Sequence, residues 1–151
     1  MSFWNTLRIG ASALSAQRLR LDVIANNIAN VETTHTEEGG PYQRKDVVFT
    51  PQGTHSFLPY FVQARRGIRN SASLGMGGVQ VAGIVTDDTP GARVYDPSHP
   101  DADEEGYVTY PNVNLVFEMT NMISATRSYE ASLSVIDSAK RMALKALEIG
   151  R

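Results

Sequence analysis

Residues 112–149 read NVNLVFEMTNMISATRSYEASLSVIDSAKRMALKALEI, and this stretch decides the fold. Mostly apolar side chains recur in it every seven residues, in two interleaved rows. One row is Leu115, Met122, Tyr129, Ile136 and Ala143, and the other is Met119, Thr126, Leu133, Lys140 and Leu147. Such rows are typical of a helix that buries a stripe against another helix. Because Pro111 and Asn112 form a helix start signal, we predict a helix over residues 112–149.

A second helix is predicted at the other end of the chain, over residues 3–31. Its heptad row is Leu7, Leu14, Leu21 and Ile28. Two long amphipathic helices in one chain most simply pair with each other, and we expect this row to pack against Met122, Tyr129, Leu133 and Ile136. Apolar residues also lie on other faces of both helices, so we expect contacts between subunits as well. A closed monomeric bundle with the middle segment as its lid is the alternative.

The middle of the chain has a different composition from the ends. All seven prolines lie in residues 41–111, and ten of the 12 glycines lie in residues 39–106. Both residue types break helices and favour turns. Strand patterns occur at residues 42–50, 79–85, 93–95 and 107–110, whereas residues 50–76 fit a long loop. We therefore predict an α+β fold, in which residues 1–33 and 112–151 form a helical domain and residues 34–111 an inserted β-rich domain.

Composition excludes several classes of protein. The chain has 151 residues, a net charge of −2 and no cysteine. The charge gives no reason to expect nucleic-acid binding, and disulfides, thiolate metal sites and a cysteine nucleophile are ruled out. No apolar run reaches the ~20 residues that a membrane span requires. The first residues also lack the basic and apolar regions of a secretory signal, so we expect neither direct membrane insertion nor secretion by that route.

Candidate sites for chemistry are few. Asp101, Asp103 and Glu105 begin like a calcium-binding loop, but Asn112 stands where the bidentate Glu is needed. We interpret this segment as an acidic turn, with weak cation binding left open. His35, His55 and His99 have no metal-ligand spacing, and Arg65, Arg66 and Arg69 form a small basic patch of the kind found on solvated loops. We expect no catalytic residues, no metal and no cofactor.

One motif in the N-terminal helix carries a family resemblance. Residues 15–33, SAQRLRLDVIANNIANVET, closely resemble the Ala-Asn-Asn-(Ile/Leu)-Ala-Asn motif of bacterial flagellar axial proteins, which form the rod, the hook and the hook-associated parts. Residues 94–114, VYDPSHPDADEEGYVTYPNVN, resemble the proximal-rod members of the flagellar basal-body rod family, and so do residues 118–131 and, further on, Ala139 and Lys140. The resemblance covers both ends of the chain and the middle from about residue 77.

The resemblance implies a non-enzymatic structural subunit of the basal-body proximal rod. Such proteins leave the cell by the flagellar type III export channel and polymerise through their terminal helices into a drive shaft that crosses the periplasm. The implied partners are further copies of the chain, the other proximal-rod and distal-rod subunits, the MS-ring and the small protein that joins rod and MS-ring. A distal-rod or hook-type subunit and a calcium-responsive adaptor are the alternatives.

The three asparagines of the motif prompt a hypothesis about assembly. Asn26, Asn27 and Asn30 are poor helix formers, and their amides offer both donors and acceptors. Helix termination explains Asn30 but poorly explains the other two, so we expect these amides to bond neighbouring subunits. On this view Asn27→Ala leaves the circular dichroism of the isolated protein unchanged but reduces its incorporation into the rod. The expected subunit interface comprises Leu7, Leu14, Leu21, Asn26, Asn27, Ile28, Asn30, Met119, Met122, Tyr129, Leu133, Ile136 and Lys140.

Overall fold

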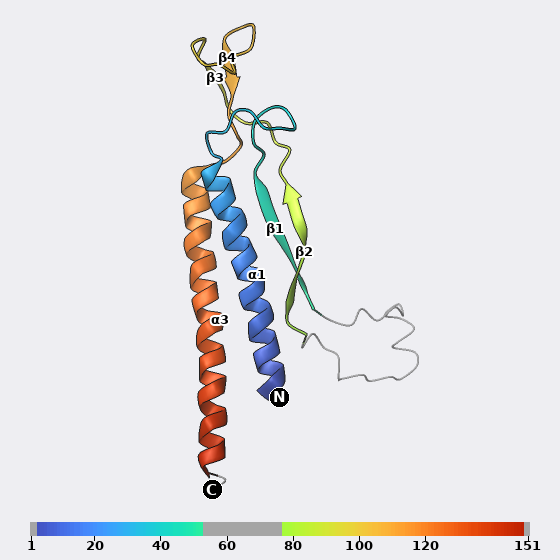
Figure 1. Cartoon of the computed structure of the whole chain (residues 1–151), viewed down its shortest axis with the longest axis vertical. Helices are drawn as coiled ribbons and strands as arrows, with labels where there is room; N and C mark the ends of the chain where they lie inside the picture. The colour runs from blue at the N-terminus through green and yellow to red at the C-terminus, as the bar shows by residue number, and fades with distance from the viewer. Residues whose placement is uncertain (1–2, 53–76, 150–151) are drawn as a thin grey trace, which may run out of the picture.

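Two long antiparallel helices form the body of the molecule. The structure, a computed structural model, describes residues 3–52 and 77–149. Helix α1 covers Phe3–Ala29 and helix α3 covers Leu115–Ile149, and the two lie side by side with the chain termini at the same end (Figure 1). At 1.5 Å per residue they are about 40 Å and about 52 Å long. The predicted helices and the α+β class are confirmed.

Helix α3 begins three residues later than predicted. Its N-cap is Asn114, whose side-chain oxygen accepts a hydrogen bond from Phe117 N at 3.1 Å. Asn112 does not cap the helix. Its Oδ1 accepts a hydrogen bond from Arg44 N at 2.9 Å, and its Nδ2 donates to Asp87 O at 3.0 Å. The start signal therefore stands at the end of the preceding loop and ties that loop to the strands.

The strands form two separate antiparallel ribbons. β1 (Lys45–Pro51) pairs with β2 (Val79–Thr86), with a bulge between Val48 and Phe49. β3 (Arg93–Tyr95) pairs with β4 (Tyr107–Thr109). All four strands were predicted, although β1 begins at Lys45 and residues 42–44 before it serve a different purpose. Residues 53–76, which contain most of the predicted long loop, His55 and the predicted basic patch, lie outside the described residues.

Helix α1 occupies the centre of the arrangement. It packs against α3 on one side and against β1 and β2 on the other, whereas β3–β4 stands at the far end of the molecule (Figure 1). Ser12 fastens the ribbon to the helix, since its Oγ accepts a hydrogen bond from Val79 N at 3.1 Å. Neither α1 nor α3 has an apolar stretch long enough to cross a membrane.

Small residues bring the two helices close together. A Cβ atom placed on Gly10 would lie 2.6 Å from Ile136 Cγ1, so the backbone of α1 directly contacts that side chain. On α3, Ala125 is fully buried and Ala139 is 3% exposed. The largest fully buried side chains are Glu118, Val108 and Asn27. Two of these three are polar, which directs attention to the end of the helix pair where they lie.

Candidate functional site: a buried polar junction

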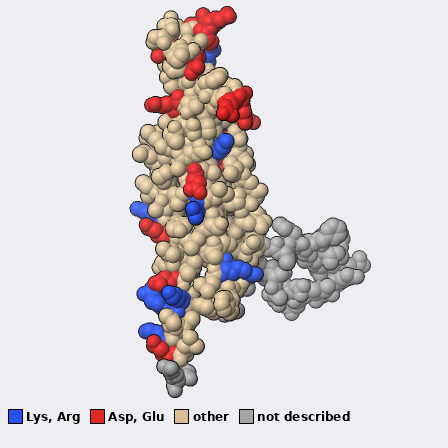
Figure 2. Space-filling view, in the orientation of Figure 1, with Lys and Arg blue, Asp and Glu red and all other residues tan. Residues whose placement is uncertain are grey.

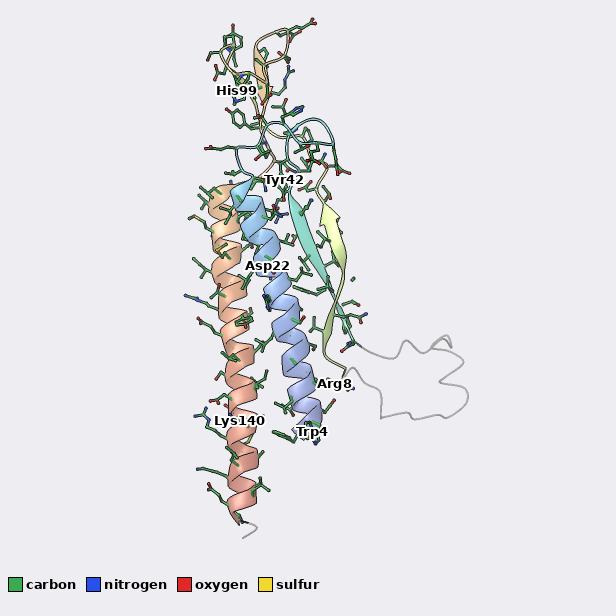
Figure 3. The ribbon with its side chains drawn as sticks, in the orientation of Figure 1. Trp4, Arg8, Asp22, Tyr42, His99 and Lys140 are labelled. Carbon is green, nitrogen blue, oxygen red and sulfur yellow. The ribbon has the colours of Figure 1, made fainter. Side chains whose placement is uncertain are left out.

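A polar junction fixes the place where α1 ends, α3 begins and the chain enters β1. We define it by Asn27, Tyr42, Arg44, Lys45 and Glu118. Asn27 and Glu118 have no exposed surface, and Tyr42 is 8% exposed. Tyr42 lies beside the end of α1 and just before β1 (Figure 3). Because burying a polar group without partners is costly, the hydrogen bonds of this junction determine whether it stabilises the fold.

Asn27 uses both ends of its amide. Its Nδ2 donates to Lys45 O at 2.8 Å and to Glu118 Oε2 at 3.2 Å. Its Oδ1 accepts from Lys45 N at 3.0 Å and from the Tyr42 hydroxyl at 2.9 Å. An asparagine amide offers two donors and two acceptor lone pairs, so its capacity is filled within the chain.

An ion pair completes the junction. Arg44 Nε donates to Glu118 Oε1 at 2.7 Å, and the two side chains are 16% and 0% exposed. The Arg44 guanidinium also lies 5.5 Å from the centre of the Phe117 ring. Its backbone is held too, since Arg44 O accepts a hydrogen bond from Asp87 N at 2.8 Å. Glu118 is thus a buried carboxylate with a charged partner and a neutral donor, as a buried charge requires.

The electrostatics of the junction follow from this arrangement. Burial, and then the negative charge of Glu118, raise the pKa of the Tyr42 hydroxyl above its ordinary value of 10.0. For Arg44, burial alone lowers the pKa, but the hydrogen bond and charge of Glu118 outweigh it and the pKa is raised. Tyr42 therefore stays neutral and Arg44 stays charged across the physiological range.

The hypothesis about Asn27 is corrected by this geometry. Its amide bonds Lys45, Tyr42 and Glu118 of its own chain and is closed to a neighbouring subunit. The expectation that Asn27→Ala leaves the isolated protein unchanged no longer follows. Asn26 is exposed, and its Oδ1 accepts a hydrogen bond from Asn30 Nδ2 at 2.7 Å, so these two amides form a pair at the end of α1.

The two heptad rows of α3 lie on different faces. Met122, Tyr129 and Ile136 are half-buried on the face of α3 toward α1. The heptad row of α1 is half-buried as well, at Leu7, Leu14, Leu21 and Ile28. Met119 and Leu133 are 53% and 52% exposed, and Lys140 is also exposed. The expectation that Leu133 packs against α1 is therefore wrong. A row through Glu118, Ala125, Ser132 and Ala139 lies in its place and lets the helices approach more closely than leucine would allow.

The acidic turn is closed by its own contacts. Asp103 Oδ1 accepts hydrogen bonds from Glu105 N at 3.0 Å and Tyr107 N at 2.8 Å, and its Oδ2 pairs with Arg93 Nη2 at 2.7 Å. The bond from Tyr107, followed by the smaller effect of Arg93, lowers the pKa of Asp103. Residues 3–52 and 77–149 contain no group of three or more His, Asp or Glu placed to hold a metal ion.

Sequence reasoning missed Tyr42, Arg44 and Glu118. A usable signal existed for Glu118, because it shares a seven-residue row with Ala125, Ser132 and Ala139. A charged residue in a row of small residues indicates a buried charge that needs a partner. No comparable signal marks Tyr42 or Arg44, whose partners are 15 and 74 residues away in the chain.

Comparison with known proteins connects this architecture to a family. The model of a family described as "Flagella basal body rod protein" matches residues 7–34, and that of "Flagellar basal body rod FlgEFG protein C-terminal" matches residues 104–149. The chain is 46% identical to the flagellar basal-body rod protein FlgC of Borreliella burgdorferi, over 99% of this chain and 98% of that protein. Identities to FlgC of Bacillus subtilis and of Salmonella typhimurium are 42% and 40%, over the full length of both chains.

The chain belongs to the FlgC family of flagellar basal-body rod proteins. It is a structural subunit of the rod, as the sequence predicted. The two family models match the segments that contain Asn27 and Glu118, so the junction joins the two regions that define this rod family. In this chain the junction therefore connects the terminal helices to the β1–β2 ribbon between them.

Proposed function

We propose that this FlgC-family subunit polymerises through α1 and α3 within the proximal rod and transmits torque along the packed helices. The supporting observation is the second heptad row of α3. Met119, Leu133 and Leu147 are 53%, 52% and 72% exposed, although their spacing is that of a helix-packing row. A row of this kind stays exposed only at a cost in apolar surface, and a neighbouring subunit would remove that cost.

The junction supports the same proposal. A shaft under torque needs subunits whose elements do not slide past one another. Asn27 and Glu118 hold α1, α3 and the start of β1 at one point through buried hydrogen bonds. The proposed partners are further copies of the chain, other proximal-rod and distal-rod subunits, the MS-ring and the protein joining rod and MS-ring. We propose export by the flagellar type III system and a final place in the part of the rod that crosses the periplasm, with no enzymatic activity.

The test replaces two apolar residues of the exposed row and leaves the face of α3 toward α1 unchanged. Met119→Ser combined with Leu133→Ser should leave the circular dichroism of the purified chain unchanged. Incorporation into isolated basal bodies should fall about tenfold, which corresponds to about 1.4 kcal/mol of lost contact energy. Arg127→Ser is the matched control, because Arg127 is exposed on the same helix and is already polar. Normal incorporation and swimming of the double variant would refute polymerisation through this face.

A further inference from the structure

The two strands of the β1–β2 ribbon have outer edges that are protected unequally. In an antiparallel pair, every second residue turns its backbone N–H and C=O away from the partner strand. The bonds from Asp87 N to Arg44 O and from Gln52 N to Gly78 O, both at 2.8 Å, identify these residues from the two ends of the ribbon. On β1 they are Lys45, Val47, Phe49 and Pro51, and on β2 they are Val79, Val81, Ile84 and Thr86.

The edge of β1 is largely blocked. The N–H and C=O of Lys45 are both bonded to the Asn27 amide. Val47 N donates to Asp46 Oδ1 at 2.8 Å, and Pro51 has no N–H to offer. Proline and charged side chains at an edge are common ways in which proteins prevent a further strand from adding there. Three of the four outward residues of β1 are therefore unsuited to pairing with another strand.

The edge of β2 is open by comparison. Val79 N is bonded, since it donates to Ser12 Oγ at 3.1 Å. In the described part of the chain, no hydrogen bond engages the outward N–H groups of Val81, Ile84 and Thr86. β2 also has no proline and no charged side chain. An edge of this kind is a template on which an extended segment of another chain can form a further ladder.

The open edge borders a groove beside α1. The groove has a volume of about 540 Å³, with Gln80 and Val81 on one wall and Arg18 and Asp22 on the other. Arg18 and Asp22 are exposed, and neither belongs to an ion pair with another described residue. Figure 3 shows Asp22 midway along α1, and uncharged side chains cover most of the visible face around the helices and the ribbon (Figure 2). These two charges are therefore available to a partner that lies in the groove.

We propose that this groove binds an extended segment of another protein, which adds as a third strand antiparallel to β2. Antiparallel pairing is the more stable of the two orientations. α1 and β2 run in the same direction from the contact between Ser12 and Val79 (Figure 1). The added strand runs the opposite way, so it passes Asp22 first and Arg18 second.

The spacing of the two charges specifies the segment. Arg18 and Asp22 are four residues apart on α1, about 6 Å along the helix axis, and alternate residues of a strand are about 6.6 Å apart. The segment therefore carries a basic residue and, two positions later, an acidic residue, with uncharged residues around them. Both charged side chains lie on the face that Val81 shares, so the N–H groups of these same residues are the ones that bond β2. This inference goes beyond the proposed function, because it concerns an extended partner and not the packing of helices.

A peptide probe tests strand addition. The probe is the fluorescein-labelled peptide Thr-Val-Thr-Lys-Thr-Asp-Thr-Val-Thr, and its fluorescence anisotropy is followed as the full chain is added. N-methylation of the Lys and the Asp removes the N–H groups that bond β2 and should weaken binding at least about tenfold. N-methylation of the Thr on either side of the Asp removes N–H groups of the opposite edge and should change binding less than about twofold. Equal losses, or no binding of the unmodified peptide at about 1 mM chain, would overturn the proposal.

Exchange of the charges tests the assignment of Arg18 and Asp22. The peptide with its Lys and Asp exchanged should bind the wild-type chain about tenfold more weakly, because each charge then meets its like. Arg18→Glu with Asp22→Lys should reverse this preference, whereas Arg127→Glu, an exposed position on α3, should leave it unchanged. If the reversed chain keeps the wild-type preference, Arg18 and Asp22 do not contact the segment and the proposal is refuted.

A substitution in β2 separates the edge from the rest of the groove. Val81→Pro removes one outward N–H and leaves the bonds between β1 and β2 in place, so binding should be lost while the circular dichroism stays unchanged. If this variant unfolds, the N-methylated peptides still decide between the outcomes. A second copy of the chain is the other occupant that the edge could take. Light scattering that shows a dimer of the purified chain, dissociated by the probe peptide, would assign the edge to that copy and overturn its assignment to another protein.

Discussion

The side-chain amide of Asn27 pairs with the backbone of Lys45 from both directions. It donates to the carbonyl at 2.8 Å and accepts from the N–H at 3.0 Å. The amide thus satisfies the first residue of β1 as a neighbouring strand would, although it belongs to a helix. Asp lacks the donor and Leu lacks both groups, so only an amide of this length fits the position.

We expect Asn27→Ala to destabilise the folded chain. The substitution leaves the part-buried N–H and C=O of Lys45 and the buried Tyr42 hydroxyl with fewer partners, at a cost of about 3 kcal/mol. Urea unfolding followed by circular dichroism measures this loss. Asn26→Ala is the matched control, because Asn26 is exposed one residue away, and it should change the free energy of unfolding by less than about 0.5 kcal/mol. Equal effects of the two substitutions would contradict the role assigned to Asn27.

We expect the ion pair between Arg44 and Glu118 to show strong coupling. Glu118→Gln leaves the half-buried guanidinium of Arg44 without a counter-charge, which should cost about 3 kcal/mol. Arg44→Met leaves the carboxylate buried with only the Asn27 amide, and the cost should be similar. The double variant Glu118→Gln with Arg44→Met removes both charges and should be more stable than the sum of the two single losses predicts. Additive losses would show that the two charges act independently.

The two helices show how much of the fold the sequence alone predicts. The heptad rows identified both helices because a repeat of seven is a local property of the chain. The same rows could not determine which of them faces α1: Leu133 fits the pattern better than Ser132, yet Ser132 is half-buried and Leu133 is exposed. Close helix approach favours small residues there, and that preference depends on Gly10 and Ile136, more than a hundred residues apart.

The partners of Asn27 in the junction were beyond prediction for a similar reason. The asparagine motif pointed to Asn27, but its partners are set by where the chain returns at Tyr42, Lys45 and Glu118. Intrachain and intersubunit bonds make the same demand on residue type, since both need a donor and an acceptor. Only the folded arrangement decides between them, whereas the exposed pair Asn26 and Asn30 behaves as helix-end residues commonly do.

We expect the Tyr42 hydroxyl to ionise at a higher pH than an ordinary tyrosine. Its folded-state pKa lies above the ordinary value of 10.0, because of burial and the charge of Glu118. Folding therefore favours the neutral phenol, so this stabilisation is fully present below pH 10.0 and is lost as the pH rises through the folded-state pKa. Subtracting the phenolate absorbance titration of Tyr42→Phe from that of the wild type isolates this group. A difference curve centred at or below the ordinary value would contradict the burial of this hydroxyl beside Glu118.

We expect the effect of Gly10→Ala on the stability of the chain to change sign when Ile136 is replaced by alanine. In the wild-type chain, Gly10→Ala places a Cβ 2.6 Å from Ile136 Cγ1. The resulting overpacking costs about 1–3 kcal/mol, which outweighs the gain of about 1 kcal/mol from replacing glycine inside a helix. In an Ile136→Ala background the obstructing atom is gone, so Gly10→Ala should instead stabilise the chain.

Four urea unfolding curves complete this cycle: wild type, Gly10→Ala, Ile136→Ala and the double variant. The coupling free energy between the two positions should be at least about 1 kcal/mol, as is found for residues in direct contact. Gly39→Ala does not serve as a control, because the backbone of Gly39 has a positive φ of 89°. Ser15→Ala does, since Ser15 lies exposed on the same helix and should be unaffected by the background. If Gly10→Ala has the same sign in both backgrounds, the two helices do not meet at this point in the folded chain.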